Sequence, residues 1–471
     1  MGDDKLHVEG SRIMLCEIGF ACFVTVMGRG LRDVGALFTW TGYGSLDVVI
    51  VANLVHVVTL LAVALVCAHR GVALLGPRSN VASTVLFVLD YLTVCVVYTL
   101  SVTAFPLLVL CQACFGFAGA LGMVGWVCTF YAEGNRASVE VLSASFFACI
   151  IGFALGCVDD VPTVCLLCTL VCIMSSVCAL GLRSTRLSCG SACEARLASP
   201  VGAVQVKSIV SAVWIPALCI GALGFMSAVA RGMLGGRDIA DMLSITMLSE
   251  AVSCFVLIVL FALGNLRAEV VSLYKVLFPV GALAFLALTF LGGRFVTVLA
   301  AVAEFSFSLC SVLMTLQAID FCRRLASPPT VVIGMFSGLN HAVLTLGYPL
   351  VSLGTDGANE QLYAVVAVVA IFVLAMVLFL AMRRSAEPDG GTGNARADTG
   401  ADAPELPGDL ASVELSGRGR EVLGLILQGR DVPSMAEVLG LSKNTVRTHV
   451  KGLYAKLDVH SRQELIDLFR R

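Results

Sequence analysis

The feature that most constrains this chain is a series of twelve apolar segments. A helix needs about 20 apolar residues to cross the hydrocarbon core of a bilayer. By that measure, spans are predicted near residues 12–28, 46–68, 81–102, 106–131, 139–157, 161–182, 208–230, 240–264, 270–292, 295–317, 330–353 and 361–382. With 58% hydrophobic residues and a mean hydropathy of +0.92, residues 1–384 are predicted to form a polytopic bundle of about 12 transmembrane helices.

The predicted topology places both termini on the same side of the membrane. The longest internal polar break, residues 183–207, divides the spans into six plus six. If the termini are cytoplasmic, fourteen Lys and Arg residues face the cytoplasm and five face outward. The positive-inside rule therefore predicts a multi-pass protein of the inner (cytoplasmic) membrane with cytoplasmic termini. The acidic start MGDDKLHVEG has no cleavage site, so we expect no signal peptide to be removed.

This outline of six plus six spans around a basic central loop resembles the major facilitator superfamily, which implies a transporter-like fold. That family usually carries G-x-x-x-D-R-x-G-R-R between its second and third spans. The matching stretch here, CAHRGVALLGPRSN at residues 67–80, keeps Arg and Gly residues but lacks the Asp. The departure weakens the expectation of active transport.

Ionisable side chains inside predicted spans are costly and are therefore candidates for function. The ligand-sensing candidates are Glu17, His56, Asp90, Glu250, Glu304 and His341. His56 and His341 could also act as pH sensors, because imidazole titrates near neutral pH. The alternative for each residue is a hydrogen bond between helices or a position at the water interface.

Nineteen cysteines are present, and seventeen lie in or beside apolar runs. They are interpreted as small buried hydrophobic residues in a reducing compartment. Cys189 and Cys193 lie in a polar loop, where a redox or metal sensor is the alternative to a plain pair of loop cysteines. Since four converging ligands are usual for a metal, no metal site and no cofactor is expected.

The composition changes abruptly after residue 384. Residues 385–414 hold seven acids and one Arg among Gly, Ala and Pro, which predicts an acidic flexible linker. At about 5–6 Å times the square root of its length, such a linker has a root-mean-square reach of about 30 Å. A domain beyond it could therefore move clear of the bilayer.

Residues 415–471 are cationic, with ten Lys and Arg against six Asp and Glu. Four helices are predicted from their start and stop signals. The signals are Ser416 with Gly429, Asp431 with Gly440, Ser442 for the third helix, and a capping box of Ser461 and Glu464 for the last. On the third helix an apolar stripe repeats at helical spacing, and cationic residues project away from it. The stripe is Val446, Val450, Leu453 and Leu457, and the cations are Lys443, Arg447 and Lys451.

This stretch, LSGRGREVLGLILQGRDVPSMAEVLGLSKNTVRTHVKGLYAKLDVHSRQEL, resembles the helix-turn-helix module of LuxR-type transcriptional regulators. The resemblance implies that Arg447, Thr448 and Lys451 face base edges in the major groove. It further implies that Lys443, Asn444, Thr445 and His449 hold backbone phosphates. Arg suits the first role, because it can grip O6 and N7 of guanine with two hydrogen bonds. By the same resemblance, Leu465, Ile466 and Phe469 belong to the core or to a dimer contact.

Together these patterns predict an all-α protein: a polytopic bundle of about 12 spans (6+6) at 1–384, a linker at 385–414, and a four-helix LuxR-type domain at 415–471. We interpret it as a membrane-bound transcriptional regulator, not an enzyme, that couples a signal to promoter binding. Its expected partners are double-stranded DNA, the lipid bilayer, an unknown small-molecule ligand and a second copy when DNA-bound. The alternatives are a secondary transporter fused to a regulatory DNA-binding module, and a module that binds protein rather than DNA.

Overall fold

The computed structural model places the chain in two compact units, Met1–Glu387 and Pro388–Arg471. It describes residues 10–28, 45–70, 77–101, 105–133, 137–158, 160–186, 201–233, 239–263, 296–325, 327–348, 417–439, 443–457 and 461–469, together with residues 280, 283 and 459. In these ranges all regular structure is helical, as predicted. The predicted domain boundaries at 384 and 414 fall outside them.

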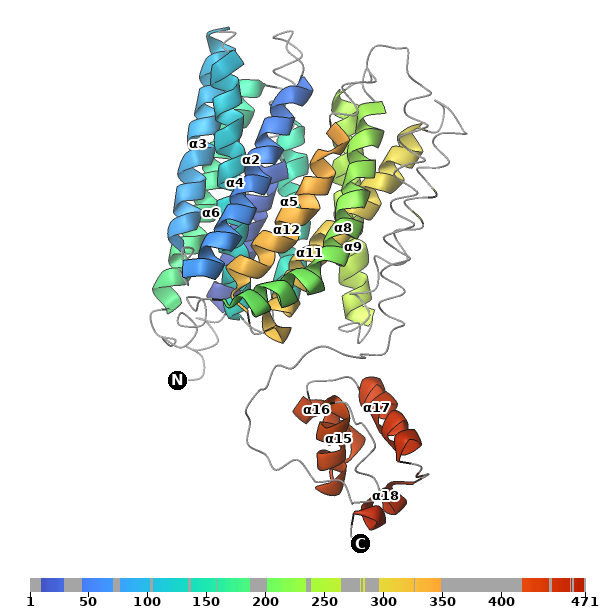
Figure 1. Ribbon diagram of the computed structural model, residues 1–471. Coiled ribbons are helices and arrows are strands. Elements are labelled where there is room, and N and C mark those ends of the chain that lie inside the picture. The colour runs from blue at the N-terminus through green and yellow to red at the C-terminus, as the bar shows by residue number, and fades with distance from the viewer. Residues whose placement is uncertain are drawn as a thin grey trace. The chain divides into compact units, whose positions relative to one another are not determined.

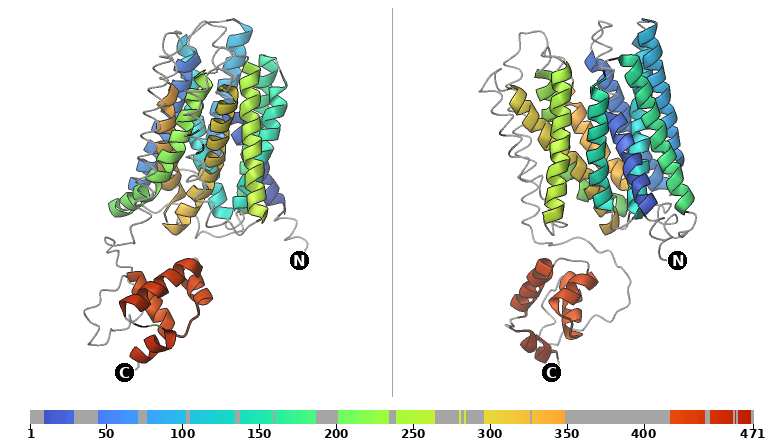
Figure 2. Two further views of the ribbon diagram at one scale, coloured as in Figure 1. Left: turned by 90° about the vertical axis from the view of Figure 1, so that its right-hand side faces the viewer. Right: turned by 180° about the vertical axis from the view of Figure 1, so that it is seen from behind.

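The first unit is a bundle of helices that run side by side (Figures 1 and 2). The described helices are Gly10–Gly28, α2 (Ser45–Arg70), α3 (Pro77–Thr99), α4 (Phe105–Glu133), α5 (Ala137–Gly156), α6 (Val161–Arg186), α8 (Ala203–Met233), α9 (Ile239–Leu263), α11 (Val296–Arg324) and α12 (Pro329–Thr345). Each corresponds to a predicted span. Seven of them are long and apolar enough to cross a membrane by length and composition. The predicted spans near 270–292 and 361–382 lie outside the described residues, apart from positions 280 and 283.

The helices of this unit are apolar on all sides, as expected where lipid rather than water surrounds the bundle. On α2, Leu60 and Ala64 are buried in the core, whereas Leu54 and Val58 are exposed on the outside. The other described helices except α12 likewise combine a buried core face with exposed large apolar side chains, whereas α12 is buried along most of its length. The first unit is therefore a multi-pass membrane domain.

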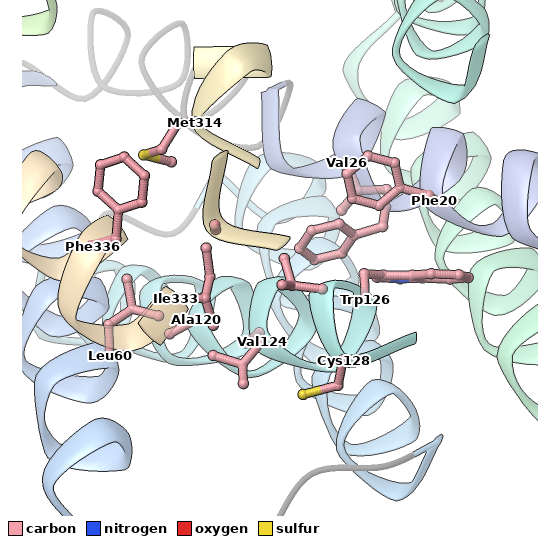
Figure 3. Packing of buried hydrophobic residues seen from close by; sticks show 14 of the residues in the cluster. Phe20, Val26, Leu60, Ala120, Val124, Trp126, Cys128, Met314, Ile333 and Phe336 are labelled. Atoms are coloured by element: carbon pink, nitrogen blue, oxygen red, sulfur yellow. The ribbon is translucent and has the colours of Figure 1, made fainter. Parts of the chain in front are cut away.

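A continuous core fills the space between these helices (Figure 3). Trp126 of α4 lies beside Phe20 of the first helix, and their rings meet edge to face at 6.0 Å. Towards the other side of the same view, Leu60 of α2 lies near Phe336 of α12. The core thus joins helices from the two predicted six-span halves.

Two helix pairs make the most extensive contacts between these halves: α2 with α12, and α5 with α9. The α2–α12 contact is close because Gly334 and Gly338 of α12 have no side chain. A Cβ at Gly334 would stand 2.7 Å from the backbone oxygen of Leu60, and one at Gly338 would stand 2.8 Å from a methyl group of Leu61. Real Cβ atoms do not approach other atoms so closely, so these glycines set the spacing between the halves.

The second unit contains the four predicted helices: α15 (Gly417–Leu427), α16 (Val432–Leu439), α17 (Lys443–Lys456) and α18 (Arg462–Leu468). They enclose a small core of their own. Its buried members are Val422, Leu423, Leu425, Ile426, Met435, Val446, Leu453, Leu457 and Leu465. The unit therefore has the means to fold independently of the membrane domain.

Three of the predicted helix signals in this unit lie where the sequence placed them. Gly429 ends α15 with a φ of +83°, a left-handed conformation that glycine adopts without steric cost. The carboxylate of Asp431 accepts a hydrogen bond of 3.0 Å from the backbone N–H of Ser434 at the start of α16. Ser461 caps α18 by accepting from the backbone N–H of Glu464 at 3.1 Å. The predicted signals at Ser416, Gly440 and Ser442 lie outside the described residues.

Candidate DNA-binding and signal-sensing sites

The helix α17 separates an apolar face from a polar one. Val446 (0% exposed) and Leu453 (2%) are buried with Leu457, and Val450 packs against them. The predicted apolar stripe is therefore confirmed. It forms because residues spaced three and four apart lie on one face of a helix, where α15 and α16 cover them.

Most of the predicted DNA-contacting side chains that the structure describes lie on the polar side of α17. Arg447, Thr448 and Lys451 are exposed, and His449 is half-buried. Lys443, Asn444 and Thr445 form the first turn of the helix, and their side chains lie outside the described part. The whole helix contains no Asp or Glu. A cationic helical face without acids is suited to contact a polyanion.

A contact that the sequence reasoning missed supports this arrangement. The guanidinium of Arg462, at the start of α18, donates a 2.9 Å hydrogen bond to the backbone carbonyl of Arg430 in the turn before α16. Burial raises the pKa of Tyr454 on α17, and the charge of Arg462 partly opposes that shift. Arg462 thereby links α18 to the turn before α16. The sequence carried a signal, since Arg462 belongs to the LuxR-type pattern, but no spacing rule assigns its partner.

The order of helices, the capped turn before α16 and the exposed cationic face of α17 agree with one family. Residues 413–469 match the model of the "Bacterial regulatory proteins, luxR family". These residues are a LuxR-type helix-turn-helix domain. The predicted resemblance is thus confirmed for this part of the chain.

Curated relatives match this LuxR-type domain and little else. One is named an HTH-type transcriptional regulator in the exeN 3′ region of Aeromonas salmonicida, 46% identical over 63 residues. Another is the HTH-type transcriptional regulator MalT of Yersinia pestis (strain Pestoides F), 35% identical over 68 residues. These matches cover 13% and 14% of this chain, and 32% and 8% of the two relatives.

The membrane domain that precedes the LuxR-type domain has the fold of known transporters. A variant of the Escherichia coli fucose:proton symporter FucP matches with a TM-score of 0.54 over 79% of this chain and 98% of its own. A POT family transporter in complex with a thioalcohol-conjugated peptide matches with a TM-score of 0.56 over 80% and 96%. Both are only 11% identical in sequence, so the likeness concerns the fold alone. The predicted transporter-like fold is confirmed.

The structure places all six ligand-sensing candidates inside helices of the membrane domain. Two of the three glutamates bond a serine on a neighbouring helix. The hydroxyl of Ser143 on α5 donates to a carboxylate oxygen of Glu17 at 2.5 Å, and the hydroxyl of Ser227 on α8 donates to Glu304 on α11. Glu250 is half-buried on α9. For Glu17 and Glu304, hydrogen bonds between helices are therefore part of their role.

Asp90 differs from the glutamates. It lies in the middle of α3 and is 2% exposed. Neither of its carboxylate oxygens has a hydrogen-bond partner among the described residues. Asn80 and Gln112 are buried in the same half and likewise lack side-chain partners there. Buried polar groups without partners are rare and often mark function.

The structure brings two candidates from opposite halves together. His56 of α2 and His341 of α12 have ring centroids 4.7 Å apart, with an angle of 53° between the rings. Nδ1 of His56 lies 3.2 Å from the carbonyl oxygen of Gly116 on α4. Nδ1 of His341 lies 2.8 Å from the carbonyl oxygen of Ser337, one turn earlier on α12.

The cysteines of the membrane domain are mostly buried, as predicted. Seventeen are described, and of these Cys157 is exposed while Cys95 and Cys114 are half-buried. Cys189 and Cys193 lie outside the described residues. Within the described ranges, no group of three or more His, Cys, Asp or Glu side chains is arranged to hold a metal ion.

Proposed function

We propose that this protein is a membrane-bound transcriptional regulator that couples a signal received in its membrane domain to promoter binding. The observation that carries the proposal is the union, in one chain, of a LuxR-type domain and a polytopic bundle with a transporter fold. Because the curated relatives share only the LuxR-type domain, the bundle is the part that would give this regulator its own input. The LuxR-type domain is similar to transcriptional regulators and the bundle to transporters, and neither class is typically enzymatic. We therefore propose no enzymatic step.

For the DNA interface we propose that Arg447, Thr448 and Lys451 read bases, while Lys443, Asn444, Thr445 and His449 hold phosphates. The exposure of Arg447, Thr448 and Lys451 on the face opposite the core supports this division. Phosphate contacts would set the register of the helix, and base contacts would select the sequence. Two copies would bind as a homodimer, since helix-turn-helix pairs address half-sites about 34 Å apart.

For the signal we propose a small-molecule ligand that contacts ionisable residues within the bundle. The candidates are Glu17, His56, Asp90, Glu250, Glu304 and His341. Asp90 and the His56–His341 contact are the strongest among them, because polar atoms of these side chains are not all satisfied by described protein partners. A bound ligand would change the packing of the halves and, through residues 385–414, the presentation or pairing of the LuxR-type domains.

The proposal requires both termini to be cytoplasmic, which the bias of fourteen against five cationic residues supports. A green fluorescent protein fused after Arg471 is expected to fluoresce, and alkaline phosphatase at the same position is expected to be inactive. Fusions in the polar segment of residues 29–44, between the first two helices, should give the reverse pattern and serve as the control. An active phosphatase after Arg471 would place the LuxR-type domain away from DNA and would refute the proposal.

A second candidate function is a working secondary transporter with an attached regulator, which the fold shared with two transporters favours. Accumulation of a solute by the full chain in reconstituted vesicles would support it. Loss of that accumulation on replacing Glu17 or Asp90 would tie transport to the ionisable residues of the bundle.

A further inference from the structure

The contact between α2 and α12 places two titratable rings at the junction of the two halves. His56 precedes Leu60 by one turn on α2, and His341 follows Gly338 by about one turn on α12. Gly334 and Gly338 of α12 pack closely against Leu60 and Leu61 of α2. The His56–His341 pair, with its 4.7 Å ring separation, is therefore part of the surface on which the halves meet.

The hydrogen bonds of the pair determine where a proton would be accepted. A carbonyl oxygen only accepts, so Nδ1 of each ring must be the protonated donor, to Gly116 in one case and to Ser337 in the other. In the neutral rings the lone pair is therefore on Nε2. Among the described residues, every hydrogen bond of the two rings uses Nδ1. A proton taken from water would bind Nε2, and the half-buried ring of His341 is the one nearer to solvent.

Among the described residues, no carboxylate near the pair would neutralise such a charge. The helix α12 has no other ionisable residue. On α11, Met314 contacts Asn340, the neighbour of His341. The acids of α11 are Glu304, which bonds Ser227, and Asp320; they lie ten and six residues from Met314, about 15 Å and about 9 Å along the helix in opposite directions.

The other described helices around the pair likewise present no acid to it. On the first helix Glu17 bonds Ser143, while Met27 is the residue that lies beside His56 at Gly119. On α4 the residues at the pair are Gly116 and Gly119, and α8 faces α12 through Gly221 and Gly224. On α2, Asp47 lies nine residues before His56, about 13 Å along the helix, and His69 and Arg70 lie at the far end.

We propose that the His56–His341 pair is a proton-dependent contact between the halves of the membrane domain. With both rings neutral, α2 and α12 pack as observed. When each Nε2 takes up a proton, two like charges face each other in an apolar surrounding with no counter-charge from the described helices, and α2 and α12 separate. The pair belongs to the membrane domain alone, and its use as an input to promoter binding rests on the proposed function.

Hydrogen–deuterium exchange of the full chain in lipid nanodiscs tests the proposal. The wild type is compared with His56→Asn/His341→Asn at about pH 4 and about pH 8, conditions well below and well above the usual titration of histidine. Asn keeps a side-chain N–H donor near the place of Nδ1–H but gains no charge. Because the chains are compared at the same pH, the intrinsic pH dependence of amide exchange is the same for both and cancels.

At the lower pH, amides of residues 52–64 and 334–345 are expected to exchange at least about threefold faster in the wild type than in the double variant. At the higher pH the two chains are expected to coincide. His69→Asn, which removes an exposed histidine of α2, should behave as the wild type. If the double variant does not fold, His56→Asn or His341→Asn alone can replace it in the same comparison, because repulsion requires two charged rings.

Equal exchange of the wild type and the Asn variants at both pH values would overturn the proposal. The proposal would also be overturned if His69→Asn slowed exchange at the lower pH as much as the double variant does. If acid separated α2 and α12 without any change in DNA binding, the proposal about the His56–His341 pair would stand. The result would then count against the proposed regulatory function.

Discussion

Replacing Arg447 by Ala is expected to weaken binding of the LuxR-type domain to its operator by about 1–3 kcal/mol, which is roughly 5- to 150-fold. Arg447 is exposed on the acid-free face of α17, next to the buried Val446 that anchors this helix in the core. A guanidinium can form two hydrogen bonds with one guanine, and Ala leaves those base acceptors without a partner. The fold should not change, because the Arg447 side chain lies outside the core.

The measurement is a titration of the separate unit Pro388–Arg471 with a duplex selected from a random pool. Arg420→Ala is the matched control, since it removes the same charge from an exposed position on α15. The control should weaken binding mainly through charge and equally for all sequences. If Arg447→Ala and Arg420→Ala had the same effect on specific and random duplexes, Arg447 would not read bases.

Gly116→Ala is expected to destabilise the membrane domain strongly. A Cβ at this position of α4 would overlap the backbone oxygen of Ala52 on α2 and would stand 2.9 Å from its carbonyl carbon. Backbone atoms of a packed helix cannot rotate away, so α2 and α4 must separate. Overpacking of this kind costs about 1–3 kcal/mol or more, which exceeds the gain of roughly 0.5–1 kcal/mol from the better helix propensity of Ala.

Thermal unfolding of the detergent-solubilised chain, followed by size-exclusion chromatography of the heated sample, measures this effect. Gly181→Ala on α6 is the control, because its Cβ would meet only the methyl groups of Leu15, the nearer at 3.3 Å. That variant should be as stable as the wild type or slightly more stable. An unfolding temperature of Gly116→Ala equal to that of Gly181→Ala would mean that α2 and α4 do not pack as described.

The features that sequence predicted well are local ones. Span length, the apolar stripe of α17 and the signals at Gly429, Asp431 and Ser461 each depend on residues within a few turns of one another. Helical periodicity and capping chemistry act over that range, so the pattern alone identifies them. The LuxR-type site was predictable for the same reason, since its reading helix is one continuous segment.

The features that sequence did not predict depend on how distant helices pack. His56 and His341 were separate candidates, and their contact follows from the approach of α2 and α12 through Gly334 and Gly338. The bond between Arg462 and Arg430 likewise joins segments 32 residues apart. No local period encodes such pairings, because they are decided by tertiary packing.

Chromatin immunoprecipitation of the tagged full-length chain, recovered from the membrane fraction of crosslinked cells, tests the central claim most directly. We predict that discrete promoter regions are enriched with the wild-type chain and lost with Arg447→Ala, while both chains remain in the membrane. A wild-type chain that enriches no region above the Arg447→Ala chain would contradict the account.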